Sequence, residues 1–283
     1  MRIAFIYKYF PSLGGAERVM TVLANEFVEK GVEIVIYSFQ QELDQPAYLL
    51  DKAISILPLP DKRKIASSMN VDYLSNDLIK NEISILLNHD TISDSMLLCK
   101  KVKEKTGIPL ITLHHGQIYL PYSSLFSIVC IKQGFNIRKA LFPLYYLYVL
   151  VRECLHHKKN IRICDAYVVL SSSFQRQLGS SSKIQAIGNP LSYSSFFDMS
   201  QYDKKENVVV MVGRISEFHK RFSLALKIWQ KIETNPAFSS WNFEIVGDGS
   251  DLAIVKKMIS ELGLQRVIMT GYANPEPYYK RAK

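Results

Sequence analysis

Four potentially cationic side chains follow one apolar run in this sequence. The run VVVMVG at 208–213 predicts a buried strand, and Arg214, His219, Lys220 and Arg221 come after it. In parallel α/β sheets, ligands bind beyond the carboxyl ends of the strands, where loops and helix N-termini meet. The planar guanidinium of Arg214 and the ammonium of Lys220 suit a diphosphate at such a place. A solvated basic turn without a ligand is the alternative interpretation.

A pair of glycines follows the first expected strand, at residues 2–7. Gly14 and Gly15 stand where a helix is expected to begin. Glycine permits positive φ and a close approach of the backbone, and the free N–H groups of a helix N-terminus attract anions. The pair therefore indicates an anion site, with a plain turn before a helix as the alternative.

Two adjacent histidines follow another expected strand, at residues 108–113. His114 and His115 precede a glycine at the carboxyl end of that strand. Neighbours on an extended chain point to opposite sides, so the two cannot both face one ligand. A functional role and a structural role in the core are both open for them.

A glycine-rich turn, VGDGSDL at 246–252, leads from a further expected strand into a helix. It falls short of the dinucleotide-binding fingerprint, because Leu252 stands where the last glycine of that fingerprint should be. A dehydrogenase is therefore the third choice among the functions considered for this chain.

The elements that must position these residues form two series of strands and helices. Strands alternating with helices predict right-handed βαβ units and parallel sheets covered on both faces. A polar stretch without periodicity at 192–206 separates the two series. The expected strands are residues 2–7, 32–39, 54–57, 83–89, 108–115, 166–173 and 183–190, followed by 208–213, 242–247 and 267–272.

This organisation predicts two domains, at 1–192 and 207–283, joined by a linker at 193–206. The second series offers only three strands, whereas an independent domain usually needs ~100–150 residues. We therefore expect the second domain to be incomplete where the sequence ends.

The net charge of +9 makes an anionic partner plausible, such as phosphate, nucleic acid or a membrane surface. The four cysteines have spacings that fit neither a zinc knuckle nor a disulfide framework, which indicates a reducing cytoplasm. No signal peptide is recognisable at the N-terminus. The longest apolar run, at 140–151, is shorter than the ~20 residues that a membrane-spanning helix needs.

Basic and aromatic residues concentrate at 132–162, where seven Lys or Arg stand against one Glu. Such a segment can rest on an anionic bilayer. The alternative is a buried helix with basic ends that reach the solvent, and Pro143 is expected to interrupt a clean amphipathic stripe. Nucleic acid is not expected as a partner, because the aromatic residues lie in one apolar block.

An ordered series of motifs resembles retaining glycosyltransferases of family 4. The opening RIAFIYKYFPSLGGAERVMTVLANEFVEKGVEIVIYS resembles the start of these enzymes, and VVLSSSF, AIGNPL, VGRISEFHKRF, FEIVGDGSDL and VIMTGYANPEPYYKRA are similar to later landmarks in order and spacing. The resemblance implies the GT-B fold, an α/β architecture with two Rossmann-like parallel-sheet domains facing a cleft. It also implies transfer of a sugar, with retention, from a UDP- or GDP-sugar donor.

The resemblance implies roles for individual residues. Arg214 and Lys220 would grip the diphosphate of the donor, and the Gly14–Gly15 turn would bring backbone N–H groups to the same phosphates. By register with the family's Thr-x-His pattern, His114 rather than His115 would lie near the reacting sugar. No metal or cofactor is expected, which suits a sequence without an Asp-x-Asp pair near a strand end. The turns that would line the nucleotide are at Gly247, Gly271 and Tyr272.

One departure from the family pattern concerns two glutamates, separated by seven residues, that hold the donor sugar. The sequence ends at Lys283, before that motif could occur. From the sequence we therefore expect these residues alone to transfer sugar poorly or not at all.

The leading hypothesis is a cytoplasmic glycosyltransferase, peripheral at the inner face of the membrane. Its acceptor would be a polysaccharide or a lipid-linked saccharide. A soluble acceptor, such as a sugar phosphate, is the alternative among enzymes. The alternative from another class is a non-catalytic GT-B module, or an interaction partner in polysaccharide assembly.

Overall fold

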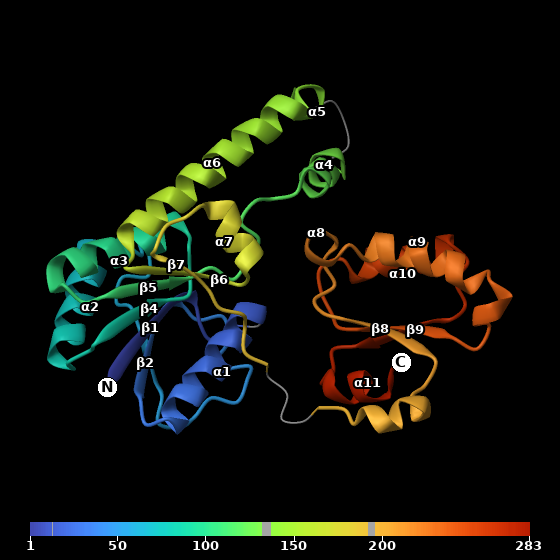
Figure 1. Cartoon of the computed structure of the whole chain (residues 1–283), viewed down its shortest axis with the longest axis horizontal. Helices are drawn as coiled ribbons and strands as arrows, with labels where there is room; N and C mark the ends of the chain where they lie inside the picture. The colour runs from blue at the N-terminus through green and yellow to red at the C-terminus, as the bar shows by residue number, and fades with distance from the viewer. Residues whose placement is uncertain (13, 132–136, 192–195) are drawn as a thin grey trace. The chain divides into compact units, whose positions relative to one another are not determined.

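The computed structural model divides the chain into two compact units, Met1–Ser192 and Tyr193–Lys283. It describes residues 1–12, 14–131, 137–191 and 196–283, drawn as ribbons in Figure 1. Part of the basic segment 132–162 and part of the expected linker 193–206 therefore lie outside the described residues. Each unit has its own parallel sheet and its own apolar core.

Unit 1 (Met1–Ser192) contains a seven-stranded sheet in the order β3-β2-β1-β4-β5-β6-β7. All neighbouring strands pair in parallel, as the alternation of strands and helices predicts. The order reverses between β1 and β4, because the chain first builds outward through β2 and β3 and then returns past β1. The strands are β1 (Arg2–Tyr9), β2 (Glu33–Gln40), β3 (Ser55–Pro58), β4 (Ile85–Asn88), β5 (Leu110–Leu113), β6 (Ala166–Val169) and β7 (Ile184–Ala186).

Helices cover both faces of this sheet (Figure 1). They are α1 (Gly15–Glu29), α2 (Ser68–Lys80), α3 (Ser93–Thr106), α4 (Tyr122–Ile131), α5 (Ile137–Ala140), α6 (Phe142–Ile163) and α7 (Ser172–Leu178). Side chains alternate along a strand, so β1 contributes to two cores. Ala4 and Ile6 join the core under α2 and α3, while Ile3 and Phe5 join the core under α1.

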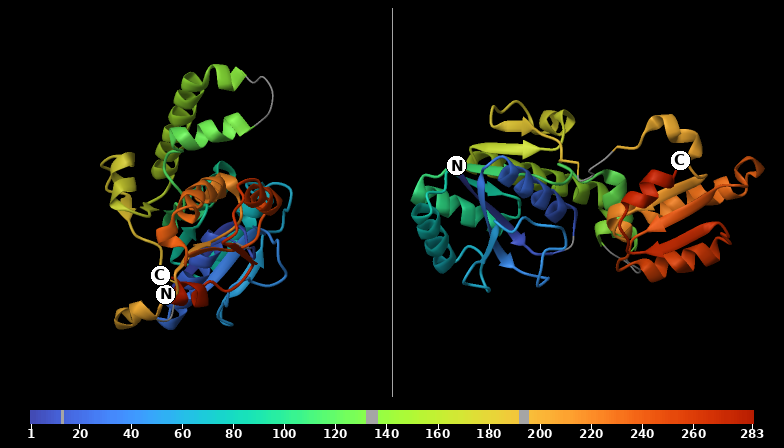
Figure 2. Two further views of the ribbon diagram at one scale, coloured as in Figure 1. Left: turned by 90° about the vertical axis from the view of Figure 1, so that its right-hand side faces the viewer. Right: turned by 90° about the horizontal axis from the view of Figure 1, so that it is seen from below.

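The helix α6 carries most of the basic segment and extends beyond the sheet (Figures 1 and 2). α4 packs beside it through a small apolar cluster that includes Leu125, Phe142 and Val149. Pro143 stands in the first turn of α6, directly after the break that separates α5 from α6. A missing backbone N–H costs no helical hydrogen bond at that position.

Among the described residues, none of the helices is both long enough and apolar enough to span a bilayer.

Unit 2 (Tyr193–Lys283) contains a three-stranded parallel sheet in the order β10-β9-β8. Leu226 and Trp229 from one helix and Val255 from another pack against Phe243 and Ile245 of the central strand. The elements are β8 (Val208–Val212), α8 (Glu217–Lys220), α9 (Phe222–Glu233), β9 (Asn242–Val246), α10 (Leu252–Glu261), β10 (Val267–Gly271) and α11 (Glu276–Arg281), with short 3-10 helices η1 (Met199–Lys204) and η2 (Pro236–Phe238).

The described part of the expected linker is structured. η1 is capped by Asp198, whose carboxylate accepts the N–H of Ser200 at 3.0 Å. Glu206 forms a parallel bridge with Ala282 and an ion pair with Arg281 at 2.6 Å. Residues 199–206 are therefore held against the end of unit 2, which the polar composition of the segment did not reveal.

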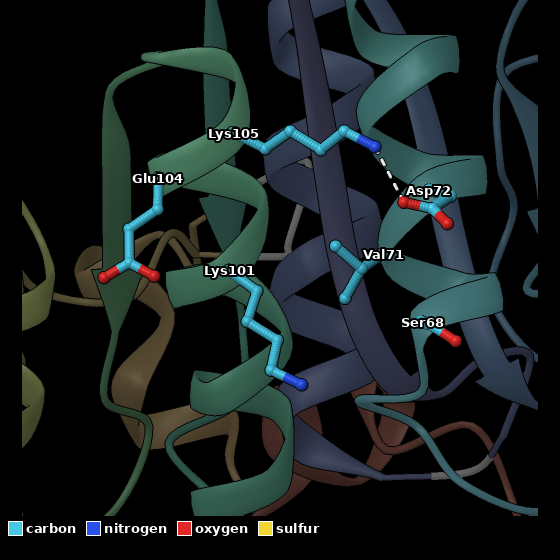
Figure 3. A pocket seen from close by; sticks show the side chains of 6 residues that line it. All are labelled: Ser68, Val71, Asp72, Lys101, Glu104 and Lys105. Atoms are coloured by element: carbon cyan, nitrogen blue, oxygen red, sulfur yellow. Dashed lines mark hydrogen bonds and ion pairs between the residues drawn. The ribbon is translucent and has the colours of Figure 1, made fainter.

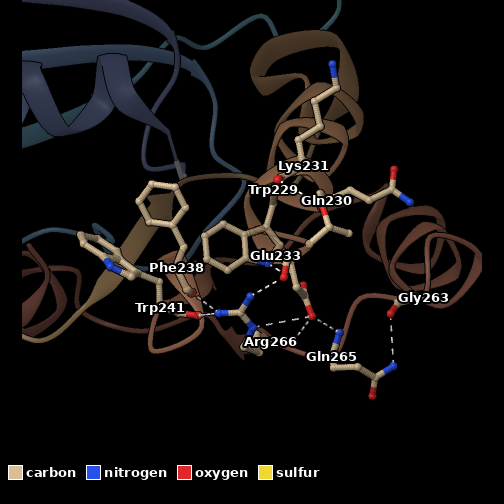
Figure 4. A network of polar contacts seen from close by, with 10 residues as sticks. Trp229, Gln230, Lys231, Glu233, Phe238, Trp241, Gly263, Gln265 and Arg266 are labelled. Atoms are coloured by element: carbon tan, nitrogen blue, oxygen red, sulfur yellow. Dashed lines mark hydrogen bonds and ion pairs between the residues drawn. The ribbon is translucent and has the colours of Figure 1, made fainter. Parts of the chain in front are cut away.

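One arginine ties together the amino-terminal edge of the unit 2 sheet (Figure 4). The guanidinium of Arg266 donates to the carbonyls of Glu233 and Trp241, each at 2.7 Å, and to that of Phe238. The carboxylate of Glu233 accepts the backbone N–H groups of Gln265 at 2.7 Å and of Arg266 at 2.9 Å. The charged groups of Arg266 and Glu233 are thus satisfied by partners within unit 2.

Candidate active site

The strand order of unit 1 reverses between β1 and β4, and doubly wound sheets bind ligands at the carboxyl ends of strands that flank such a reversal. Tyr7 lies near the carboxyl end of β1, and His89 and Asp90 directly follow β4. His114 and His115 directly follow β5, the next strand along the sheet. We call this region the carboxyl edge of unit 1.

Five of the chain's six histidines gather at or beside this edge. The rings of His89 and His115 stack with their centroids 5.4 Å apart. The rings of His114 and His157 meet at right angles at 4.9 Å, and His156 lies next to His157. The sixth, His219, belongs to unit 2, and its side chain lies outside the described residues.

His114 is held on the α6 side of the sheet. Its Nε2 lies 3.0 Å from the carbonyl oxygen of Gln117, and its Nδ1 lies 3.2 Å from the hydroxyl of Thr91. A carbonyl can only accept, so Nε2 carries the proton and Nδ1 accepts from Thr91. Burial lowers the pKa of His114, and the ring is therefore neutral at pH 7.

His115 points to the opposite side of the sheet, as expected for the neighbour of His114. Its Nε2 lies 3.2 Å from Nδ1 of His89, a residue that is 2% exposed and packs on Phe5. Burial and the nearby His114 lower the pKa of His115 to about 4, and burial lowers that of His89 well below its usual value. The two neutral rings share one hydrogen bond, and Nε2 of His89 has no partner among the described residues.

Two buried carboxylates at this edge, Asp90 and Glu17, were not predicted from the sequence. Asp90 is tied to the start of α3, because its carboxylate accepts the N–H of the N-cap residue Ile92 at 2.8 Å and the hydroxyl of Ser95 at 2.7 Å. Burial nevertheless raises the pKa of Asp90. The position of Asp90 directly after an expected strand, in the run NHD, was an available signal. Glu17 lay hidden within a helical pattern.

The Gly14–Gly15 turn begins α1, and Gly14 is its N-cap. A Cβ at Gly14 would overlap the carboxylate of Glu17, whereas one at Gly15 would meet open space. Glu17 also accepts hydrogen bonds from Ser12 at 2.7 Å and from Tyr7 at 3.2 Å. This carboxylate therefore shares the N-terminal turn of α1 with any anion that binds there.

Glycine turns join the carboxyl ends of the unit 2 strands. Gly213 and Gly247 both have φ +150°, and a Cβ at Gly247 would overlap the carbonyl oxygen of Gly213. The N–H of Gly247 donates to the carbonyl of Gly271 at 2.7 Å, and Gly271 has φ +80°. Only glycine adopts such conformations readily, so these turns require it. They bring the ends of β8, β9 and β10 together.

Two cationic residues lie at the same edge of unit 2. Arg214 directly follows Gly213, and both Arg214 and Lys220 are exposed. Lys220 folds back over the turn, because a Cβ at Gly213 would lie 3.1 Å from its Cε. Tyr272, which follows β10, is 69% exposed. The structure thus gathers all five candidate residues of unit 2 at one place, which we call the carboxyl edge of unit 2.

A shallow surface hollow lies elsewhere, between α2 and α3 of unit 1 (Figure 3). An ion pair between Asp72 and Lys105, at 2.7 Å, crosses it. None of the sequence-derived candidates lines this hollow. Within the described ranges, no three His, Cys, Asp or Glu side chains are placed to hold one metal ion.

Comparison with known proteins gives matches over nearly the whole chain. The profile of Glycosyltransferase Family 4 matches residues 13–192, and that of Glycosyl transferases group 1 matches residues 194–283. A curated relative from Campylobacter jejuni is 23% identical over 294 residues, which are 100% of this chain and 71% of the relative. That protein is a GalNAc-alpha-(1->4)-GalNAc-alpha-(1->3)-diNAcBac-PP-undecaprenol alpha-1,4-N-acetyl-D-galactosaminyltransferase.

Two solved structures share the fold. The lipopolysaccharide outer core galactosyltransferase WaaB, in its apo form, has a TM-score of 0.63 at 21% identity, over 99% of this chain and 70% of that chain. A mutant of S. aureus TarM in complex with Fondaparinux, alpha-GlcNAc-glycerol and UDP has a TM-score of 0.69 at 11% identity, over 99% and 79%. The expected GT-B fold, with a Rossmann-like parallel sheet in each unit, is confirmed, and the chain belongs to glycosyltransferase family 4.

Proposed function

We propose that this glycosyltransferase takes its sugar from a nucleotide-diphosphate sugar, with UDP or GDP as the nucleotide, and transfers it with retention. The acceptor in this proposal is a polysaccharide or a lipid-linked saccharide. The observation that carries the donor half of the proposal is the carboxyl edge of unit 2. Arg214 and Lys220 are exposed there, beside glycine turns that hold the ends of β8, β9 and β10 together.

The chemistry of the leaving group supports this use of the edge. When the sugar departs, negative charge grows on the nucleotide diphosphate, and fixed cations stabilise that charge as it forms. Arg214 offers a planar pair of donors, whereas Lys220 offers a mobile point charge. Tyr272, with its exposed ring, is suited to stack on a base.

The carboxyl edge of unit 1 is assigned to the sugar. His114 and His115 are neutral there, because burial lowers the pKa of both. A neutral imidazole can donate to or accept from a sugar hydroxyl, and it does not compete with Arg214 and Lys220 for the phosphates. In this proposal His114 is the residue nearest the reacting sugar, because it occupies the histidine position of the family's Thr-x-His pattern. Its two ring hydrogen bonds would then have to rearrange when the donor binds.

The relatives support both halves of the proposal, the acceptor and the donor. The C. jejuni relative acts on a saccharide linked through diphosphate to undecaprenol, and TarM was crystallised with UDP. A lipid-linked saccharide and a UDP-sugar are therefore the first substrates to test.

Calorimetric titration with UDP and with GDP tests the donor site directly. We expect one of the two to bind, and Lys220→Ala to weaken binding by about 10- to 100-fold, as the loss of a charge-assisted hydrogen bond implies. Lys231→Ala on α9 is the matched control, because Lys231 is also exposed but lies toward the other end of its helix.

Two outcomes would contradict the proposal. Either neither nucleotide binds, or the Lys231 control weakens binding as much as Lys220→Ala does. Absence of binding would favour the non-catalytic module instead. Retention is checked separately, by the anomeric configuration of the product in a nuclear magnetic resonance spectrum.

A further inference from the structure

One side of α6 exposes a continuous row of apolar side chains. They recur every three or four residues, so they lie along one side of the helix. The opposite side carries the buried Phe142, Val149 and His157. The row consists of Leu141, Leu144, Leu147, Tyr148, Val151 and Leu155, which are 50% to 64% exposed. We call it the α6 outer face.

This contiguous apolar row is unusual for a surface in contact with water. Scattered exposed leucines are normal on soluble proteins, but contiguous apolar surface marks an interaction site. One member of this row, Tyr148, is aromatic and 60% exposed. Aromatic side chains of this kind are favoured at the boundary between lipid and water.

The charges around the α6 outer face are almost all positive. Its C-terminal continuation carries Lys158, Lys159 and Arg162, and Arg152 lies beside the apolar row; all four are exposed. Glu153 is the one acidic residue of the sequence 137–163. Its carboxylate accepts the backbone N–H of Leu120 at 3.1 Å, which keeps it within the unit.

This charge pattern distinguishes between possible occupants. A second copy of the chain would bring its own lysines and arginines against these, and like charges repel. A surface of anionic lipid would instead attract each of them, and the apolar row could enter the boundary between headgroups and acyl chains. A helix that lies in this boundary can bury its leucines among the acyl chains and place its basic residues at the headgroups.

We propose that the α6 outer face docks unit 1 on a bilayer that contains anionic phospholipids. The helix lies in the plane of the interface, with Leu144, Tyr148 and Val151 at the depth of the upper acyl chains. Lys158 and Lys159 bind the phosphates of neighbouring headgroups. The docking uses none of the residues assigned to sugar transfer, so the two proposals stand or fall separately.

Sedimentation with vesicles tests the docking. We expect the protein to bind vesicles of phosphatidylcholine with phosphatidylglycerol, and to bind vesicles of phosphatidylcholine alone at least 10-fold more weakly. Lys158→Glu combined with Lys159→Glu should weaken binding to the anionic vesicles by at least 10-fold. Leu144→Glu combined with Val151→Glu should do so as well.

The α10 and α9 helices of unit 2 supply matched controls. Lys256→Glu with Lys257→Glu reverses two exposed neighbouring lysines, and Ile228→Glu with Ile254→Glu replaces two apolar residues that are 52% and 56% exposed. Neither control should change vesicle binding by more than about twofold. Equal losses in these controls, or equal binding to both kinds of vesicle, would overturn the proposal.

A fluorescent reporter keeps the test valid if the glutamate variants fold poorly. The two tryptophans of the chain, Trp229 and Trp241, both lie in unit 2, so Tyr148→Trp adds one in α6. Its emission should shift to shorter wavelength with anionic vesicles and stay unchanged with neutral ones. A shift that depends on protein concentration without lipid would instead identify a second copy as the occupant, and would overturn the proposal.

Discussion

The carboxyl edges of the two sheets present opposite kinds of chemistry. The edge of unit 1 is lined by histidines and carboxylates that are largely buried and packed against one another. The edge of unit 2 carries exposed cations on glycine turns, and Lys220 has no ion-pair partner among the described residues. Burial lowers the pKa of His89, His114 and His115, so unit 1 offers neutral groups where unit 2 offers permanent charge.

This difference fits a division of labour within one transfer reaction. A diphosphate is best held by fixed cations that are already accessible to it. A sugar hydroxyl is best met by neutral donors and acceptors. If this division holds, substitutions and changes of pH should affect the two edges differently.

Gly247→Ala should be the most damaging single change. The new Cβ would overlap the carbonyl of Gly213, and the φ of +150° is unfavourable for alanine. We expect a loss of about 3–5 kcal/mol in the stability of unit 2, from overpacking plus backbone strain. Urea denaturation followed by tryptophan fluorescence measures it, because both tryptophans lie in unit 2.

Gly15→Ala is the matched control in unit 1. A Cβ at Gly15 meets nothing within 4 Å, so stability should be nearly unchanged. A Gly247→Ala protein as stable as the wild type would show that the glycine turns of unit 2 are not constrained as described.

Acidification should destabilise unit 1 and spare unit 2. His115 has its pKa lowered to about 4 in the folded state, against about 6.5 when unfolded. Between these values the unfolded chain binds more protons, so the free energy of unfolding falls as the pH drops from about 6.5 to about 4. The loss for His115 alone is on the order of 3 kcal/mol.

The two units can be separated in this experiment. Unit 2 contains a single histidine, His219, so its tryptophan transition should move little over the same pH range. The circular dichroism transition, which reports both units, should move. His115→Asn should flatten the pH dependence. If both transitions moved together, the neutral histidines would not be the distinguishing property of unit 1.

The parallel sheets could be predicted from the sequence because their strands are buried and apolar. The buried strand β1 and the glycine turns of unit 2 could also be predicted, because each is encoded by a short continuous stretch of sequence. The gathering of histidines could not be predicted, because His89 follows β4, His115 follows β5 and His157 lies in α6, far apart in the sequence. Likewise, the contact of Glu206 with Ala282 is set by tertiary packing, and polar composition alone made that segment look like a linker.

His114→Ala should separate the chemical step from donor binding. If unit 1 handles the sugar and unit 2 the diphosphate, turnover should fall about 100-fold, or about 2.7 kcal/mol, while nucleotide affinity stays unchanged. Turnover is measured on a protein that also carries the two spaced glutamates of the family pattern. Steady-state kinetics with calorimetry measures both quantities. His156→Ala, at a neighbouring ring, is the control and should keep turnover within a few-fold. An equal loss of nucleotide affinity in His114→Ala would contradict the division between the edges.

Lys105→Ala should have the smallest effect, because the hollow between α2 and α3 lies outside both edges. Lys105 pairs with Asp72 at 2.7 Å, but the two side chains are 44% and 59% exposed. Exposed ion pairs contribute about 0–1 kcal/mol, since water screens them and the side chains lose freedom on pairing. Stability should therefore change by less than about 1 kcal/mol, and both nucleotide affinity and turnover should match the wild type. A loss of turnover in this variant would place a functional surface on the helices of unit 1, and the division between two carboxyl edges would then be incomplete.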